Sequence, residues 1–272
     1  MLSPPESLLL IAGNGQYPFQ LAAAARRRGV KRLFAAAFEQ ETNPKLAEVV
    51  DEIRWLKVGQ IGKLLTYARE TGVHHAIMAG QIAPTNLFDL RPDFAALLLL
   101  AKLKERNAET LFGAVADALA GEKVELLPAT TFLDEFLAPI GHFAGPKPGR
   151  RAVADVAFGL RIAKETSRLD IGQTVVVRHG TVLAVEAFEG TNEAIKRGAA
   201  LGRGQAVAVK VSKPNQDLRF DVPVIGPLTI EAGAAAGLSV FAVEAGRTLL
   251  LEPDTLRALA GDHRISLLGI ET

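Results

Sequence analysis

The residues best suited to phosphate chemistry are concentrated in one stretch of the sequence, Val185 to Gly226. Two carboxylates, Glu186 and Glu189, stand where the apolar run TVLAVEAF gives way to Gly190-Thr191-Asn192. This change of pattern predicts the start of a helix, capped by Thr191 or Asn192. The free backbone N–H groups at such a helix end suit an anion, so this point in the chain is a candidate phosphate-binding site.

A second polar cluster follows the alternating apolar run AVAVKV, and a loop that follows a strand in this way often presents a site. The cluster consists of Ser212, Lys213, Pro214, Asn215, Gln216 and Asp217. Asp217 and Asp221 then flank Arg219 and Phe220. Carboxylates, two cations and amides within one segment are the groups that a metal-assisted phosphoryl enzyme needs.

Each of these residues also has a structural explanation. Glu189 and Thr191 are equally consistent with ordinary helix capping. Lys213 with Asp217 is equally consistent with a solvated surface pair that adds little stability. The density of such residues in loops after strands, rather than any one of them, favours a site.

The N-terminal region predicts a βαβ unit in which SLLLIAG is a buried strand and Gly13-Asn14-Gly15 forms the turn before an alanine-rich helix. Glycines at such a turn let the backbone approach a phosphate. The third glycine of a dinucleotide fingerprint is replaced by Pro18, although Glu39 and Glu41 stand where a ribose-binding acid is expected. A nicotinamide-dependent oxidoreductase is therefore an alternative hypothesis.

A later strand, HHAIMAG, ends in Gly80-Gln81. Because ligands in open parallel sheets lie at the carboxyl ends of the strands, Asn14 and Gln81 are expected to face one crevice. His74 and His75 stand at the opposite end of this strand and are expected to be surface residues.

Composition excludes several classes of protein. With 31 basic and 30 acidic residues, the net charge of +1 does not provide the one-signed field of a general nucleic-acid binder. The absence of cysteine excludes thiolate metal sites and cysteine nucleophiles, and it is consistent with a cytoplasmic location. No secretory signal is recognised, and the longest apolar run, Phe94 to Ala101, is far shorter than the roughly 20 residues of a membrane span.

The pattern of elements predicts an α/β protein with two α/β domains. Residues 1–139 form a Rossmann-like N-terminal domain, and residues 152–272 form a catalytic domain whose hairpin around His179-Gly180 implies a mixed sheet. Three glycines, two prolines and three basic residues in IGHFAGPKPGRR predict a linker or hinge at 140–151. Such a hinge would allow the domains to close over a substrate held between them.

Several strings in this order resemble the LpxI-type UDP-2,3-diacylglucosamine pyrophosphatases of lipid A biosynthesis over nearly the whole chain. They are IAGNGQYP, VGQIGKLL, MAGQIAP, RNAETLFGAVADALA, LLPATTFLDE, AKETSRLDIGQTVVVRHGTVLAVEAFEGTNEAIKRG and VKVSKPNQDLRFDVPVIGP. The resemblance implies two α/β domains that bind the lipid nucleotide between them. It also implies that UDP-2,3-diacylglucosamine is hydrolysed to UMP and 2,3-diacylglucosamine 1-phosphate (lipid X), with water attacking the α-phosphorus. The implied cofactor is Mg²⁺ or another divalent cation.

The same resemblance assigns a role to one of the residues singled out above, and the roles of the others are assigned from motif position and chemistry. Asp221, in RFDVP, matches an aspartate whose loss disables such enzymes, and it either binds Mg²⁺ or orients the water. Asp217, Glu186 and Glu189 are the other candidate metal ligands, because Mg²⁺ takes one or two protein carboxylates. Lys213, a candidate catalytic residue, and Arg219 would neutralise phosphate oxygens. The remaining candidate substrate-binding residues are Gly13, Asn14, Gly15, Gln16, Gln81, Gly190, Thr191, Asn192, Asn215 and Gln216.

A lipid substrate implies further partners. The resemblance leads us to expect peripheral contact with the inner face of the cytoplasmic membrane. No nucleic-acid partner is expected, and a homo-oligomer is left open. The apolar segment Phe94 to Leu103 is either a core helix or the surface that receives the acyl chains. A non-enzymatic UDP-sugar-binding protein is the second alternative to the pyrophosphatase.

Overall fold

The structure is a computed structural model that describes residues 4–82, 92–103, 108–214 and 216–272. Its contacts divide the chain into two compact units, and each is described by itself. The first unit contains residues up to Leu133 together with Asp217–Asp221, and the second contains Asp134–Gln216 and Val222–Thr272. The prediction of two α/β domains is confirmed.

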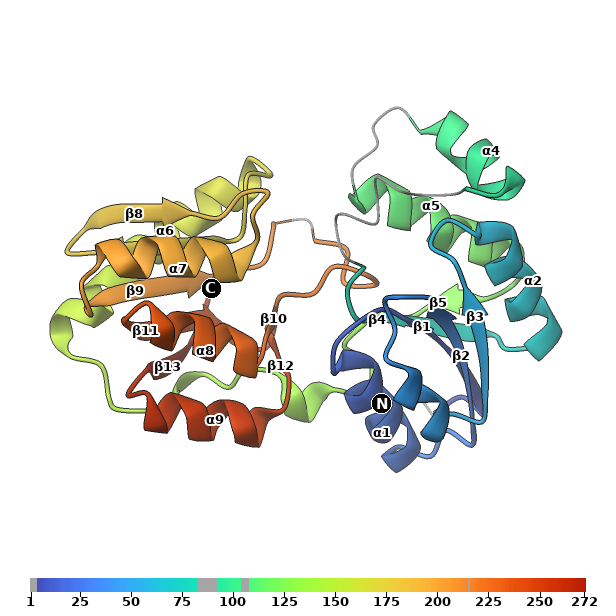
Figure 1. Ribbon diagram of the computed structural model, residues 1–272, viewed down its shortest axis with the longest axis horizontal. Coiled ribbons are helices and arrows are strands. Elements are labelled where there is room, and N and C mark those ends of the chain that lie inside the picture. Colours follow the sequence, from blue (N-terminus) through green and yellow to red (C-terminus); the bar gives the residue numbers. More distant parts are fainter. Residues whose placement is uncertain (1–3, 83–91, 104–107, 215) are drawn as a thin grey trace. The chain divides into compact units, whose positions relative to one another are not determined.

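The first unit is built on a parallel sheet of five strands in the order β3-β2-β1-β4-β5. The strands are β1 (Ser7–Ala12), β2 (Arg32–Phe38), β3 (Glu52–Leu56), β4 (His75–Ala79) and β5 (Glu125–Leu126), and Figure 1 shows them in blue to green. β1 is almost wholly buried and pairs with β2 and β4 in register, Leu9 lying opposite both Phe34 and Ala76. Strands buried on both faces account for the continuous apolar runs in the sequence.

The helices of the first unit are α1 (Tyr17–Arg27), α2 (Ile61–Thr71), α4 (Phe94–Lys102) and α5 (Ala108–Gly121), with a short 3₁₀ helix at Pro44–Glu48. α2 ends at Gly72, whose left-handed backbone (φ 66°) suits glycine. Leu64 and Tyr67 of α2 and Val115 and Leu119 of α5 pack on the sheet in one core. Parallel strands with covering helices place the carboxyl ends of β1, β2 and β4 at one edge of the sheet.

The second unit contains a mixed sheet of six strands in the order β6-β13-β11-β9-β7-β8. β9 (Ala206–Lys210), β11 (Leu238–Glu244) and β13 (Ser266–Ile270) are parallel, whereas β6 (Gly141–Ala144) and the hairpin β7 (Thr174–Arg178) and β8 (Thr181–Val185) run antiparallel to their neighbours. A separate pair joins β10 (Val224–Ile225) to β12 (Leu249–Leu250). The predicted mixed sheet and the turn at His179-Gly180 are confirmed.

Four helices cover the second sheet: α6 (Arg150–Arg168), α7 (Thr191–Leu201), α8 (Pro227–Ala235) and α9 (Pro253–Asp262), beside a 3₁₀ turn at Asp134–Phe136. Alternate strand residues point to opposite faces, so Val175 and Val177 pack with Ala163 of α6 while Val176 packs with Ile195 of α7. Helix α8 contacts both α7 and α9, and Figure 1 shows it between them. Helix α7 lies so close to the sheet that a Cβ on Gly198 would be 2.5 Å from that of Val176. The result is a three-layer unit.

The predicted linker at 140–151 is wrong. Gly141–Ala144 is strand β6, paired with β13, and Arg150 begins α6. Gly145 reads as hinge-like in sequence but has a structural reason, because a Cβ there would lie 1.9 Å from the carbonyl oxygen of Ile265. The boundary between the units falls at Leu133/Asp134 instead, so the predicted domain ranges of 1–139 and 152–272 need correction at that junction and at 217–221.

Candidate active site

The loops after β1 and β4 are joined through their backbones in the first unit. The amide of Asn14 donates to the carbonyl of Gln81 at 2.8 Å, and that of Gly13 donates to Ala79 at 2.8 Å. The approach is so close that a Cβ on Gly13 would lie 2.6 Å from the Gln81 carbonyl oxygen. The expected proximity of Asn14 and Gln81 at the carboxyl edge of the sheet is confirmed, and glycine is required at Gly13 for that contact.

Side chains extend this junction to the loop after β2. Asn14 donates through Nδ2 to Glu41 at 2.9 Å, and Thr42 accepts from the amide of Phe38 at 2.9 Å while donating to the carbonyl of Ala12. Gly15, Gln16 and Gln81 remain exposed around this buried junction. Gln16 precedes α1 without capping it through its side chain, so its amide group faces solvent at the site edge.

The segment Asp217–Asp221 belongs to the first unit, although it follows a strand of the second. The carbonyl of Leu218 accepts from Ala129 at 2.7 Å, and the ring of Phe220 lies 5.7 Å from that of Phe112. Phe220 also packs against the core formed by α2, α5 and the parallel sheet. These contacts anchor the segment on both sides of Arg219, and the Asp221 amide closes it by donating to the Asp217 carbonyl at 3.0 Å.

The two carboxylates of this segment differ. Asp217 is held by Arg219 through both oxygens, with Nη2 to Oδ2 at 2.6 Å and Nε to Oδ1 at 3.0 Å. The hydrogen-bonded guanidinium lowers the pKa of Asp217, and the carboxylate raises that of Arg219. Asp221 is partly exposed, and no hydrogen bond or ion pair engages its carboxylate within the described ranges. The predicted metal ligand Asp217 and phosphate-binding Arg219 thus neutralise each other, and Asp221 is the available carboxylate.

A chain of three side chains marks the start of α7 in the second unit. Lys210, at the end of β9, donates to the Thr191 hydroxyl at 2.7 Å, and that hydroxyl donates to Glu186 Oε1 at 2.8 Å. The other oxygen, Oε2, is buried, and none of the described residues hydrogen-bonds to it. Gly190 allows the turn with φ 83°, so the helix begins with its first-turn amides, including that of Asn192, beside this chain.

Glu189 is committed to another partner. Its Oε1 forms an ion pair with Arg197 at 2.7 Å, and its Oε2 accepts from the amide of Ala187 at 3.1 Å. The hydrogen bond from Arg197 lowers the pKa of Glu189. Glu189 therefore holds its own loop and caps no helix. The predicted cap of this helix by Thr191 or Asn192 is also wrong, because the N-cap of α7 is Gly190, without a side-chain cap hydrogen bond. Among the described residues, no three histidine, aspartate or glutamate side chains gather as a metal-binding group.

Lys213 and Gln216 begin the loop that leads to Asp217. The Lys213 ammonium is paired with Asp170, and its backbone amide donates to Gln216 Oε1 at 2.8 Å. The Lys213–Asp217 surface pair considered from the sequence is therefore not formed, because each residue has another partner. Asn215 lies outside the described residues.

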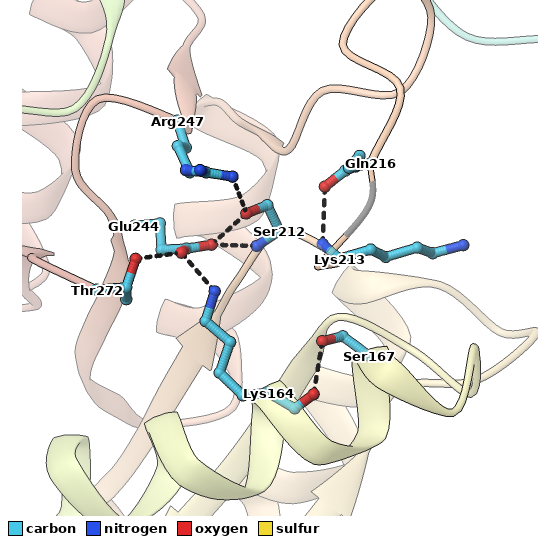
Figure 2. Close-up of polar contacts among 8 residues, drawn as sticks. All are labelled: Lys164, Ser167, Ser212, Lys213, Gln216, Glu244, Arg247 and Thr272. Atoms are coloured by element: carbon cyan, nitrogen blue, oxygen red, sulfur yellow. Dashed lines mark hydrogen bonds and ion pairs between the residues drawn. The ribbon is translucent and has the colours of Figure 1, made fainter.

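Sequence reasoning missed a buried carboxylate at the end of β11. Figure 2 shows Glu244, which is 0% exposed, receiving hydrogen bonds from Lys164 at 2.5 Å, Thr272 at 2.6 Å, and both the hydroxyl (2.6 Å) and amide of Ser212. Burial opposes ionisation of Glu244, but these bonds outweigh it and lower the pKa to about 2. The available signal was a glutamate within the apolar run SVFAVEAG, a position where charge survives only if paired.

Two α/β units with polar groups at strand ends and at a helix N-terminus are typical of proteins that bind phosphorylated ligands. The chain belongs to the LpxI family. It matches the LpxI N-terminal domain over residues 7–136 and the LpxI C-terminal domain over residues 139–268.

One relative is similar over nearly its whole length. The UDP-2,3-diacylglucosamine pyrophosphatase LpxI of Caulobacter vibrioides is 34% identical over 277 residues, covering 96% of each chain. Among solved structures, the biotin carboxylase subunit of pyruvate carboxylase is similar with a TM-score of 0.28 and 14% identity, over 71% of this chain and 42% of that one. A likeness of that size carries no structural argument.

Proposed function

We propose that this protein hydrolyses the pyrophosphate bond of UDP-2,3-diacylglucosamine to UMP and 2,3-diacylglucosamine 1-phosphate, in lipid A biosynthesis. The observation that carries the proposal is the 34% identity to a UDP-2,3-diacylglucosamine pyrophosphatase over 96% of both chains. The chemistry of each unit agrees with it, because the first offers the partly exposed carboxylate of Asp221 and the amide group of Asn14, and the second offers Lys210 beside the start of α7.

In the proposed reaction, a water oxygen attacks the α-phosphorus, the bond from that phosphorus to the bridging oxygen breaks, and the sugar phosphate leaves. Asp221 is the residue that we assign to this step, since it is partly exposed and is held on a loop anchored by Leu218 and Phe220. It would orient the attacking water or hold a divalent cation. A bound Mg²⁺ would neutralise charge on the phosphate oxygens, and one carboxylate with water and phosphate is a usual ligand set for it.

The other residues would bind and orient the substrate. Asn14, Gln16 and Gln81 offer amide groups suited to uracil or ribose edges, beside Gly13 and Gly15. The start of α7 at Gly190, with Thr191 and Lys210, offers donors suited to the diphosphate. Lys213 would reach a phosphate by exchanging its exposed partner Asp170, whose side chain is 59% exposed.

Two alternatives considered from the sequence gain no support. For a nicotinamide-dependent oxidoreductase, Glu39 or Glu41 would have to hold a ribose. Glu41 is buried and bonded to Asn14, which leaves the exposed Glu39, and Pro18 stands in place of the third glycine of the fingerprint. A UDP-sugar-binding protein without turnover shares the recognition groups but gives no reason for an open carboxylate at Asp221. The family membership favours neither.

The lipid part of the substrate requires an apolar surface, and we assign it to one face of α4. Phe94 is 76% exposed and Leu97 and Leu98 are each 51% exposed, at the spacing that places them with Ala101 on one side of a helix. None of the described helices is long and apolar enough to span a bilayer. We propose that the exposed apolar side chains of α4 make peripheral contact with the inner membrane surface. A homo-oligomer stays a prediction.

Replacing Leu98 with aspartate tests that assignment. We expect KM for the diacylated substrate, presented in mixed micelles, to rise about tenfold, because a charge would face the acyl chains, with little change in the melting temperature. The matched control is Leu201→Asp, at a leucine of the second unit that is 61% exposed. Equal effects of the two substitutions would contradict the assignment to α4.

The reaction itself is tested by phosphorus NMR of the products formed in ¹⁸O-labelled water with Mg²⁺. We expect the label in UMP, and no product from Asp221→Ala. Label in the sugar phosphate would mean attack at the β-phosphorus. Absence of turnover by the wild-type protein, together with tight UDP-sugar binding, would replace the proposal with the binding-protein alternative.

A further inference from the structure

The chain leaves the second unit after Gln216 and re-enters it at Val222. The five intervening residues carry Asp221 and belong to the first unit. Two short stems in the second unit mark where this excursion begins and ends: residues 212–214 with Gln216, which we name the outgoing stem, and residues 222–224, the return stem. The contacts that hold these stems therefore affect the position of Asp221.

The outgoing stem is held at its first residue by Glu244. Oε2 of Glu244 accepts both from the Ser212 hydroxyl, at 2.6 Å, and from the Ser212 amide, and Ser212 is itself wholly buried. Lys164 and Thr272 hold the other oxygen at 2.5 and 2.6 Å. Figure 2 shows Lys164 reaching this carboxylate from α6 and Arg247 reaching the Ser212 hydroxyl, at 3.4 Å.

The return stem is held by the turn that follows the same glutamate. The amide of Thr248 donates to the Glu244 carbonyl at 3.1 Å, which closes the turn between β11 and β12. The next residue, Leu249, donates to the Pro223 carbonyl at 2.8 Å, and Val224 then pairs with Leu249 as β10 meets β12. The outgoing stem is thus fastened to the Glu244 side chain, and the return stem is fastened to β12, the strand that follows the turn closed by the Glu244 carbonyl.

The chemistry of this junction favours a role beyond packing. A carboxylate without solvent contact is costly unless its lone pairs are satisfied, and an apolar residue in its place is often as stable. Glu244 accepts four hydrogen bonds, two of them from one residue of the outgoing stem. A neutral amide could not accept all four, since one of its two polar atoms is a donor.

We infer that Glu244 is a positioning residue for Asp221, because its side chain fixes the outgoing stem of the excursion that carries the aspartate. The inference rests on the proposed hydrolysis for its kinetic consequence. Its structural content, the order of the outgoing stem, stands apart from that function. Glu244 itself touches neither substrate nor reacting atoms.

Two single-hydroxyl variants on the same carboxylate provide the first test. Ser212→Ala removes a bond to Glu244 on the outgoing stem, whereas Thr272→Val removes one that touches neither stem. We expect kcat to fall about tenfold in Ser212→Ala and less than about twofold in Thr272→Val, with KM within about twofold in both, because misplacement of a reacting group lowers kcat. Equal kcat losses in the two variants would overturn the inference.

Hydrogen exchange of the amides at 212–224 provides the second test and does not need catalysis. Glu244→Gln should increase exchange in the outgoing stem, which the Glu244 side chain holds, and change it little in the return stem, which backbone hydrogen bonds hold. The control is Asp155→Asn, which removes another buried carboxylate of this unit, bonded to the His179 and Gly180 amides at 2.8 Å each. Unchanged exchange of the outgoing stem in Glu244→Gln, or an equal increase in Asp155→Asn, would overturn the inference. A wild-type protein without hydrolase activity would contradict the proposed function, and the exchange result would still decide the positioning role.

Discussion

The two units hold their carboxylates in opposite ways. In the first, Asp217 and Arg219 form an ion pair whose side chains are 27% and 39% exposed, and Asp221 beside them is open. In the second, Glu244 is sealed from solvent and receives four hydrogen bonds. Exposed pairs contribute little to stability and exchange partners easily, whereas a buried pair resists opening. The first unit therefore leaves the Asp221 carboxylate accessible, and the second uses Glu244 to hold its own backbone.

The largest effect expected from this comparison separates the two aspartates of the first unit. Asp221→Asn should lower kcat about a thousandfold, because it removes a charge that acts on the reacting water or its cation. Asp217→Asn should lower kcat about tenfold or less, since asparagine can still accept from Arg219. Steady-state kinetics with the diacylated substrate measures both. Comparable losses would mean that the Asp217–Arg219 pair, rather than the open carboxylate, is essential.

A smaller effect, on stability, tests the buried carboxylate of the second unit. The pKa of Glu244 is lowered from 4.5 to about 2 in the folded protein. Its contribution to the free energy of unfolding is therefore complete above pH 4.5 and is lost as the pH falls toward about 2. Glu244→Gln should lose about 3 kcal/mol near neutral pH, and the difference from wild type should shrink with acidification.

Urea unfolding at a series of pH values measures this difference directly. Asp217→Asn is the matched control, because the Asp217 pKa is also lowered, but its pair is partly exposed. Its effect on stability should be small at every pH. A pH-independent loss in Glu244→Gln would mean that packing, not charge, accounts for the role of Glu244.

The same contrast explains what the sequence could predict. Buried parallel strands, the hairpin at His179-Gly180 and the helix beginning at Thr191 follow from local periodicity and turn chemistry, and the structure has all of them. The approach of Asn14 to Gln81 was also predictable, because parallel strands bring their carboxyl ends to one edge. These inferences depend only on neighbours in sequence or on a general property of the sheet.

The residues that were misjudged depend on distant partners. Nothing near Phe220 in the sequence indicates that it packs with Phe112, which is distant in the chain. The sequence therefore does not predict that Asp217–Asp221 joins the first unit. Glu244 resembles an ordinary strand end until Lys164, 80 residues away, reaches it. The strand at Gly141–Ala144 was hidden because its pairing with β13 is invisible in a glycine-rich segment.

The smallest expected effect concerns the neutral amide groups of the first unit. Asn14→Ala should weaken UMP binding about fivefold, because it removes a side chain whose orientation Glu41 fixes at 2.9 Å. Glu41→Gln should weaken it about twofold, since an amide can still accept from Asn14. Calorimetric titration with UMP measures both.

The control is Asn43→Ala, at an exposed asparagine that caps the helix at Pro44–Glu48 instead. If Asn14→Ala binds UMP as tightly as Asn43→Ala does, Asn14 only joins loops. The ligand-facing role would then pass to Gln16 and Gln81, whose side chains are already exposed at that edge.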